Sequence, residues 1–582
     1  MVVGTLTDVT SGVAAAGVFF LAFVAPFETT RPLLRLPWQS VSSLEAALVL
    51  ALAAWGAAIV RSGRAPDWDI PLAPVWLAFL LAMSIAAIAA PAERTNASHM
   101  AGRFVAAAAV YALTVHGITS STRLRRALAI SVGSGVVVAV LALLEYFQIA
   151  PVLNWLRVFR PGVTAVGSQV RAGGPLQYPT IASMYLEVVF AFGLGLLLSA
   201  IDAGDRWRAA GWFAALVAIG HAITLTYTRA GLIVMVASLL VVGAWRVRAR
   251  GLEFGGWTLA ALAIAVSALF PVSRAPQSLW LRLTSEGQDS WYRASVSAPE
   301  SLSFGVDRAH DVSLEVTNTG RVAWDSLGAS PIYFSYHWLD ASGERVIAYE
   351  GARTEFADPV APGATATIHS IVRAPRQPGT YLIEWDLVQE GRLWFSTEQG
   401  APESTMTRAT VSGEGIGGPL TTSARPARAV RPGRFVLWRA AAQMVVAHPF
   451  LGVGPDNFRL LYGPYAGVAH ADPRTHTNNM YLEVLVGGGL LAAAVFAWFL
   501  WAASALFATA AHQGRTGVGP RSDPGPTPVG TGIAAAGLAI ALHATVDSFL
   551  SFAPTYILFA LTLGFAAALA RGFDGTADAH RA

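Results

Sequence analysis

The most regular feature of the chain is the recurrence of long apolar stretches separated by short polar connections. A bilayer core about 30 Å thick needs roughly 20 apolar residues in a helix, so each stretch predicts a membrane-spanning helix. We expect twelve spans, near residues 11–27, 43–60, 72–91, 101–118, 127–147, 178–200, 209–227, 230–245, 255–272, 477–509, 530–550 and 554–570. The pattern therefore predicts an all-α polytopic membrane protein with two membrane regions, residues 1–272 and 477–582.

A different pattern occupies residues 273–415. Short alternating runs rich in Val, Ile, Tyr and Trp, such as "DVSLEVTNTGRVAW" and "GTYLIEWDLVQEGRLWF", are separated by Gly, Pro, Asn and Asp turns. This spacing predicts an inserted all-β sandwich of immunoglobulin-like type. Tryptophans here could stack on sugar rings, but core positions are favoured for Trp324, Trp338, Trp385 and Trp394. Residues 416–433 are small, Gly/Pro-rich and basic, and are predicted to be a linker.

The short connections predict the orientation, because they retain arginine on the cytoplasmic side. With the N-terminus inside, the even-numbered connections hold most of these arginines: Arg61, Arg64, Arg123, Arg125, Arg126, Arg206, Arg208, Arg246, Arg248 and Arg250. Both termini are therefore expected in the cytoplasm and the sandwich outside it. The first span lacks the basic start and cleavage site of a signal peptide, so we expect a retained helix.

Composition narrows the class of protein. Only 13% of the 582 residues are charged and 54% are hydrophobic, whereas soluble domains run near 25% charged, so an ordinary soluble enzyme is excluded. The absence of cysteine excludes disulfides, thiolate metal sites and cysteine nucleophiles. Every basic side chain is an arginine, which binds phosphate bidentately, although genome composition alone could explain this bias.

Two arginines stand out on the predicted outer face. Arg171 precedes "YPT", where Pro179 can start a helix, and a helix N-terminus beside an arginine suits an anion. For this stretch alone, a loop arginine at the headgroup level is the better interpretation. Arg229, in "TYTRAG", lies between two apolar spans; it either faces a cavity or snorkels to the interface, and the sequence favours neither.

Residues 434–476 are predicted to form an extracytoplasmic amphipathic helix and loop. Phe435, Trp438, Ala442 and Val445 fall on one face of a helix over 434–447, which suits a helix lying along the membrane surface. The following "GVGPDNF" is a glycine turn whose backbone can approach a ligand closely.

The segment "THTNNMYLE" places His476, Asn478, Asn479 and Glu483 at the mouth of the tenth span. A histidine can act as a general base near neutral pH, and asparagine amides can orient sugar hydroxyls or phosphates. A polar helix cap is the alternative for this segment taken alone. Zinc is disfavoured because no second histidine follows at i+4, so we expect neither a metal nor a cofactor.

His543 and Asp547 form a fourth candidate. Their i, i+4 spacing in a predicted apolar span puts both on one helical face. Polar pairs inside a membrane serve either function or helix–helix bonding, and the structural role is slightly favoured here.

Taken together, these segments resemble the O-antigen ligase and polymerase superfamily of multi-spanning glycan transferases. The similarity covers about 1–272 and 434–570, and "HTNNMYLEVLVGGGL" carries it most specifically. The other similar segments are "TYTRAG", "GRFVLWRAAAQMVVAHPFLGVGPDNF" and "HATVDSFL".

The resemblance implies roles for particular residues. Arg229 and Arg434 match the paired arginines that are thought to hold the pyrophosphate of an undecaprenyl-linked glycan. Asn478 stands where the family has its catalytic histidine, so either His476 takes that role or the protein is not a conventional ligase. Candidates for substrate binding are Arg171, Asn478, Asn479 and Glu483.

We therefore expect a metal-independent transferase in the bacterial inner membrane that moves a glycan from undecaprenyl pyrophosphate to a lipid or glycan acceptor, with no nucleic-acid partner. A polymerase of lipid-linked repeat units would use the same site. A transporter or flippase would favour Gly/Pro-broken spans in matching halves, which the sequence does not show. A non-catalytic assembly protein stays open because of Asn478.

Overall fold

A computed structural model describes residues 2–35, 40–63, 65–160, 162, 164–166, 169–272, 291–327, 331–390, 393–397, 403–418, 420–424, 432–468, 471–512 and 527–573. The chain divides into two compact units. The helical unit comprises Met1–Thr164, Arg171–Pro276 and Arg434–Ala582, and the second unit comprises Ala165–Val170 and Gln277–Gly433.

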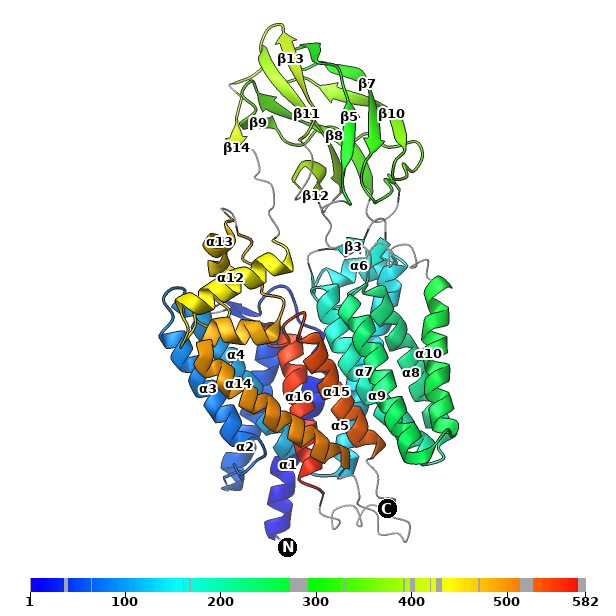
Figure 1. Ribbon diagram of the computed structural model, residues 1–582, viewed down its shortest axis with the longest axis vertical. Helices are drawn as coiled ribbons and strands as arrows, with labels where there is room; N and C mark the ends of the chain where they lie inside the picture. Colours follow the sequence, from blue (N-terminus) through cyan, green and yellow to red (C-terminus); the bar gives the residue numbers. More distant parts are fainter. Residues whose placement is uncertain are drawn as a thin grey trace. The chain divides into compact units, whose positions relative to one another are not determined.

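The helical unit is built from long apolar helices (Figure 1). In its first part these are α1 (Val2–Val24), α2 (Ser43–Ser62), α3 (Ala73–Ile88), α4 (Arg94–Gly117), α5 (Ser121–Tyr146), α6 (Ala150–Leu156), α7 (Pro179–Asp202), α8 (Arg206–Leu225), α9 (Arg229–Arg250) and α10 (Phe254–Val272). Its last part holds α12 (Arg434–Ala447), α13 (Phe458–Ala466), α14 (Met480–His512), α15 (Pro528–His543) and α16 (Ala553–Ala570). Two short hairpins pair β1 (Leu34–Arg35) with β2 (Ser40–Val41) and β3 (Thr164–Val166) with β4 (Gln169–Arg171).

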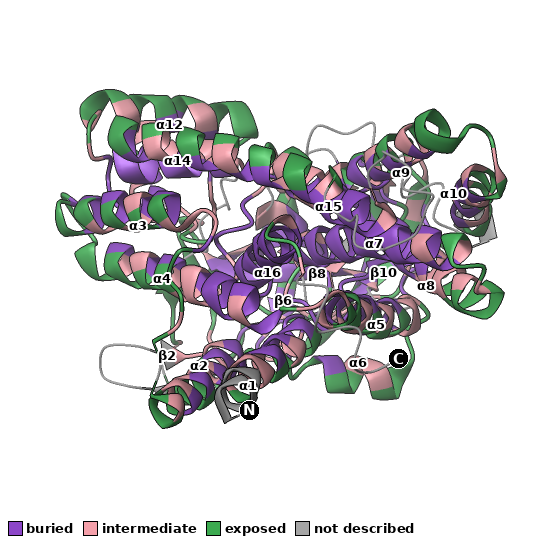
Figure 2. Cartoon of the chain, turned by 90° about the horizontal axis from the view of Figure 1, so that it is seen from below, coloured by how far each residue is buried: buried purple, intermediate pink, exposed green. Residues whose placement is uncertain are grey.

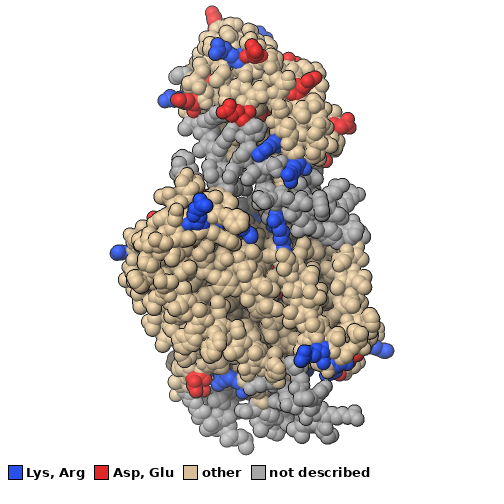
Figure 3. Space-filling model, viewed as in Figure 1, with Lys and Arg blue, Asp and Glu red and all other residues tan. Residues whose placement is uncertain are grey.

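Every predicted span overlaps one of these helices. Among the described residues, seven helices are long and apolar enough to cross a membrane, namely α2, α5, α7, α8, α9, α14 and α16. Shorter apolar helices occur within α1, α3, α10 and α15. Figure 3 shows a broad band of uncharged surface on the helical unit, with arginines and acidic residues gathered near its ends. A helical membrane protein is therefore confirmed, while the number of twelve spans stays a prediction.

The core of the helical unit surrounds α7. Figure 2 shows α7 and α16 almost wholly buried, whereas the helices around them keep an exposed face. α7 packs on α5, α8, α9 and α15. The contact with α15 is close because glycines meet there: a Cβ on Gly195 would lie 2.8 Å from Pro528 O, and one on Gly532 would lie 2.8 Å from Gly195 Cα. Small residues let membrane helices approach in this way.

α14 is bent at Gly489, whose backbone is non-helical at φ 64°. A loop from residues 449–454 fills the bend with backbone hydrogen bonds. Val453 N donates to Val486 O at 2.9 Å, and Leu490 N donates to Pro449 O at 2.8 Å. The groups freed by the kink are thus satisfied. This pairing fixes the loop "GVGPDNF" against the start of α14.

The second unit is β-rich, as predicted. One sheet has the order β10 (Thr365–Arg373), β7 (Ala309–Asn318), β5 (Ala294–Ser297). The other has the order β14 (Ser423–Ala424), β9 (Arg345–Ala348), β8 (Ile332–Asp340), β11 (Gly379–Gln389), β13 (Met406–Ser412), β6 (Ser301–Gly305), with β12 (Leu393–Trp394) on β11 and a 3-10 turn, η1 (Phe395–Thr397), after it. Only β13 and β6 pair in parallel among the described strands.

The aromatic core of this unit agrees with the sequence prediction. Trp324, Trp338, Trp385 and Trp394 are all buried. The two sheets meet where Trp338 Nε1 on β8 donates to Arg373 O on β10 at 2.9 Å. The immunoglobulin-like assignment itself stays a prediction.

Gly489→Ala is expected to destabilise the protein. The left-handed backbone strains any other residue by roughly 1–3 kcal/mol, and a Cβ would lie 2.4 Å from the Phe450 carbonyl carbon. The measurement is the thermal unfolding midpoint in detergent. Gly102→Ala, at a helical glycine with open space around it, is the matched control and should be neutral or slightly stabilising. Equal midpoints for the two variants would contradict the role given to the kink.

Candidate functional site

Arg434 is placed by the helix that it begins. The buried side of α12 consists of Leu437, Ala440, Ala441 and Met444, which pack in one cluster with residues of α13 and α14. The face predicted to lie along the membrane surface is largely outside this core, since Phe435 is 83% exposed and Ala442 is exposed. Trp438, one turn after Arg434, donates its Nε1 hydrogen to Thr477 O at 3.0 Å. This bond ties the start of α12 to the segment that carries His476.

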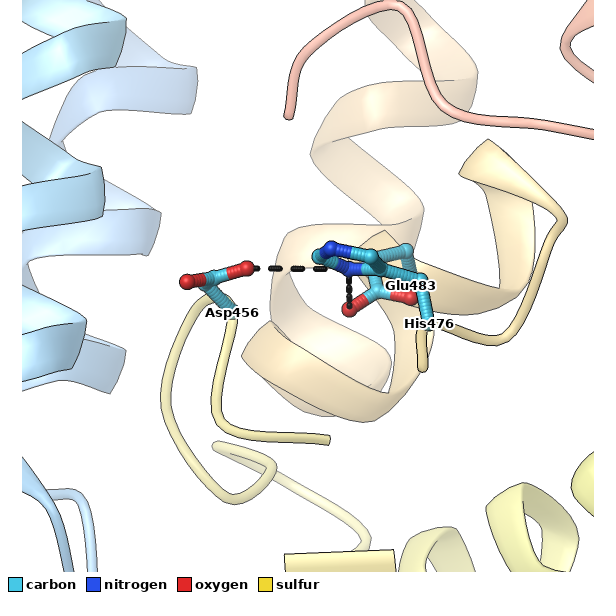
Figure 4. A group of neighbouring side chains, drawn as sticks. All are labelled: Asp456, His476 and Glu483. Carbon is cyan, nitrogen blue, oxygen red and sulfur yellow. Dashed lines mark ion pairs between the residues drawn. The ribbon is translucent and has the colours of Figure 1, made fainter. Parts of the chain in front are cut away.

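His476 lies between two carboxylates (Figure 4). Its Nδ1 is 3.7 Å from Asp456 Oδ1 and 3.8 Å from Glu483 Oε1. All three side chains are largely buried. Because both carboxylates approach Nδ1, Nε2 is the ring nitrogen that neither of them engages. The sequence predicted His476 and Glu483 as site residues but not Asp456.

Each carboxylate is anchored through its other oxygen. Asp456 Oδ2 accepts hydrogen bonds from Arg459 Nε at 2.8 Å and from Asn96 Nδ2 at 3.2 Å. Glu483 Oε2 accepts from the Thr477 backbone N at 3.1 Å and from its hydroxyl at 2.7 Å. The anchors direct one oxygen of each acid towards the imidazole. Carboxylates anchored by their own hydrogen bonds fix the orientation of a neighbouring histidine ring.

The two acids change the basicity of the imidazole. Burial alone would lower the pKa of His476, but the carboxylate of Glu483, together with that of Asp456, outweighs burial and raises the pKa above its ordinary 6.5. The positive charge of Arg459 works against this rise. The neutral form, which alone can accept a proton, is therefore reached at a higher pH than for a free histidine.

The same three residues could hold a divalent cation. One ligand atom from each of Asp456, His476 and Glu483 lies within 4.8 Å of the others. Two carboxylates and an imidazole are a suitable donor set for a transition metal. The absence of cysteine and of a second histidine at i+4 does not reveal this group, because its other two members are acids. The expectation of a metal-free site stays a prediction.

The two predicted substrate-binding asparagines have different surroundings. Asn479 is used by the protein itself: Oδ1 accepts from Leu482 N at 3.0 Å, and Nδ2 donates to Thr545 O at 3.0 Å. It caps the start of α14 and ties it to the loop after α15, the alternative that the sequence left open. Asn478 is half-buried in the turn before α14, with a left-handed backbone at φ 52°.

Arg171 supports the turn that precedes Arg229. Its side chain is buried, and Nε donates to Thr226 O at 2.9 Å while Nη2 donates to the Thr228 hydroxyl at 3.5 Å. The next residue adds a backbone bond, Ala172 N to Leu225 O at 3.0 Å. Tyr227, within the turn, has φ 52°. These contacts fix the turn that precedes Arg229, whose own side chain is exposed.

The predicted arginine pair is close enough to interact. Desolvation lowers the pKa of Arg434 although its side chain keeps solvent access; the carboxylate of Asp547 raises this pKa, and the positive charge of Arg229 lowers it. The charges of Arg229 and of the acid Asp547 thus both act on Arg434, the first residue of α12. Two interacting arginines suit an anion with more than one negative charge.

His543 and Asp547 do not share a helical face, contrary to the prediction. α15 ends at His543, so the predicted span 530–550 is too long, and Asp547 lies in the loop that follows. The partner of His543 is Glu187 on α7, with Nδ1 2.6 Å from Oε1. This glutamate was missed in the sequence, although a single acid inside an apolar span is itself a signal of function.

Comparison with known proteins supports the resemblance found in the sequence. The family described as O-Antigen ligase matches residues 403–497. The matched region contains Arg434, Asp456, His476 and Glu483, whereas Arg229 lies outside it. No curated protein matches the chain.

Arg171→Ala is expected to destabilise the turn at residues 225–229. Removing a buried charged donor leaves Thr226 O without that bond, at a cost of about 1.5–3 kcal/mol. Hydrogen exchange of the turn amides and the unfolding midpoint measure the effect. Arg474→Ala, which removes an exposed arginine paired with Asp472, is the control and should change neither by much. Unaltered exchange at the turn in Arg171→Ala would contradict the role of Arg171 in fixing it.

Proposed function

Because residues 403–497 match the O-antigen ligase family, we propose that the protein transfers a glycan from an undecaprenyl-pyrophosphate carrier to an acceptor at the outer side of the bacterial inner membrane. The observation that carries the proposal is His476 between Asp456 and Glu483, bonded through Thr477 to the helix that begins at Arg434. A histidine oriented by carboxylates beside an arginine pair supplies a base and an anion site together.

The proposed reaction is a displacement at the anomeric carbon of the donor sugar. Nε2 of His476 accepts the proton of the acceptor hydroxyl, and the hydroxyl oxygen bonds to the anomeric carbon. The bond from that carbon to the diphosphate oxygen breaks, and the electron pair leaves with the diphosphate. Arg229 and Arg434 stabilise the leaving charge by bidentate hydrogen bonds. The step needs no redox partner and no metal.

This assignment gives His476 the role that the family gives to the residue at position 478. The amide of Asn478 cannot accept a proton, whereas the imidazole of His476 is oriented by two anchored acids. Glu483 and Asp456 hold Nδ1, and Asn479 and Arg171 keep their structural contacts rather than binding substrate directly. We place both termini in the cytoplasm and the β-rich unit outside it, as the arginine distribution predicts.

Substitutions at the arginine pair and the base are expected to abolish surface glycan. Arg229→Ala, Arg434→Ala and His476→Ala are tested by complementation of a deletion strain, since removal of one charge-stabilising donor or of a base typically costs about 10²–10⁴ in rate. Arg439→Ala, at an exposed arginine on the same helix α12, is the control and should restore glycan. Normal surface glycan with all three site variants would make the transferase assignment wrong.

A gel of the lipid-linked and surface-attached glycan in the deletion strain distinguishes a ligase from a polymerase. Polymer accumulating on the lipid carrier identifies a ligase, whereas single accumulated units identify a polymerase. Loss of transport with unchanged glycan linkage would instead support a carrier.

The pH dependence of transfer is expected to follow His476. Its pKa is raised, so the rate of the purified protein should increase with pH through a value above 6.5. Asp456→Asn or Glu483→Gln removes a negative charge that raises this pKa, so the increase should move to lower pH in either variant. Initial rates from pH 5 to 9 measure it.

A chelator tests whether a metal ion, rather than the His476 base, is responsible for this pH profile. With EDTA present, the wild-type profile should stay the same, because the three residues act as a base and its orienting acids. A profile that loses its rate with EDTA and recovers with a divalent cation would contradict the general-base assignment. A rise that moves to higher pH in Asp456→Asn would contradict it as well.

A further inference from the structure

Glu187 and His543 form a buried pair that the proposed reaction does not use. Both side chains are 0% exposed, and His543 Nδ1 lies 2.6 Å from Glu187 Oε1. They come from α7 and α15, helices whose other buried residues are mostly apolar. Ionisable groups among apolar membrane helices are costly, and they usually serve a function.

Helix packing places this pair beneath the helix that begins at Arg229. Ser183 lies one turn before Glu187 on α7, so the two share a face. That face contacts the start of α9, because a Cβ on Gly231 would lie 1.8 Å from the Ser183 hydroxyl oxygen. α9 also packs on α15. The α9 N-terminus has no side-chain cap, since the hydroxyl of Thr228 accepts a hydrogen bond from Arg171 instead.

The end of α15 is also fixed to the segment of His476. Met480 N donates to Ala544 O at 2.8 Å, and Asn479 Nδ2 donates to Thr545 O. The charges of Arg434 and Asp547 act on His543. His543 is therefore at the end of a helix that packs on α9 and that is bonded to the segment tied to α12 by Trp438.

One polar atom of the histidine lacks a partner. Among the described residues, Nε2 of His543 is buried and makes no hydrogen bond, and the same holds for Oε2 of Glu187. Buried polar atoms in proteins are nearly always hydrogen-bonded, so an unpaired one on a buried histidine is available to a ligand. Glu187 engages Nδ1, so in the imidazolium form Nε2 carries a hydrogen to donate. An anion is the complementary ligand.

We propose that His543, oriented by Glu187, is a third phosphate-contacting residue, whose Nε2 donates to the diphosphate of the lipid-linked donor at the α9 N-terminus. This inference rests on the proposed function for the identity of the donor. Glu187 then holds Nδ1 of His543, and Nε2 donates to a phosphate oxygen bound between the arginines.

His543→Asn is the decisive variant. An asparagine amide can reproduce the Nδ1 contact with Glu187 but has no atom at the position of Nε2. Affinity for undecaprenyl pyrophosphate is measured on the full-length protein in nanodiscs, with inorganic pyrophosphate as the headgroup probe. We expect His543→Asn to bind both probes roughly tenfold to a hundredfold more weakly while its unfolding midpoint stays near that of the wild type. Wild-type affinity in a folded His543→Asn protein would overturn the proposal.

Matched variants separate this inference from the proposed function. Ser183→Ala removes an unpartnered buried hydroxyl from the same face of α7 and should leave affinity unchanged. If Arg229→Gln and Arg434→Gln weaken binding but His543→Asn does not, the inference fails and the proposed function stands. If none of the three weakens binding, both fail.

A second variant covers the case in which His543→Asn does not fold. Glu187→Gln keeps the size of the side chain but removes the charge that favours the protonated ring. It should weaken binding of inorganic pyrophosphate by about threefold or more, because a charge-assisted bond becomes a neutral one. Unchanged binding in Glu187→Gln would then overturn the proposal.

Discussion

The cost of burying charge among apolar helices determines where the polar residues of this protein lie. A charged group inside such a unit needs a partner, a hydrogen-bonded anchor or a ligand. Arg171 meets this requirement with the Thr226 carbonyl, and Glu483 meets it with Thr477. Nε2 of His543 lacks a hydrogen-bond partner among the described residues, whereas Nδ1 of His476 faces two carboxylates, at 3.7 and 3.8 Å.

The site depends on backbone geometry as much as on charge. The bend at Gly489 opens α14 so that the loop from residue 449 can pair with it, and this pairing brings Asp456 to the imidazole. Arg459 of α13 and Asn96 of α4 then fix the carboxylate of Asp456 beside His476 and Glu483. Gly489 therefore has a structural reason: only a residue tolerant of φ 64° allows the loop to approach.

The sequence predicted the features that depend on local composition and missed those that depend on contacts between distant segments. Apolar length located a helix at every predicted span, and alternation located the β-rich unit with its buried tryptophans. Hydropathy did not show that α15 ends at His543, because Val546, Phe549 and Leu550 continue the apolar stretch beyond the helix. Glu187 and His543 are 356 residues apart, so neither spacing nor periodicity could pair them. Sequence spacing could not show that Arg171 bonds to the turn at Thr226, 55 residues away; its substrate binding stays a prediction.

In the proposed site the donor diphosphate lies between Arg229 and Arg434, and the first sugar faces His476. The most direct measurement is a cryo-EM structure of the protein in nanodiscs with an undecaprenyl-pyrophosphate-linked glycan. We expect diphosphate density in contact with both guanidinium groups, with the anomeric carbon of the first sugar on the Nε2 side of His476. Diphosphate density away from both arginines, or a divalent cation between Asp456, His476 and Glu483, would contradict it.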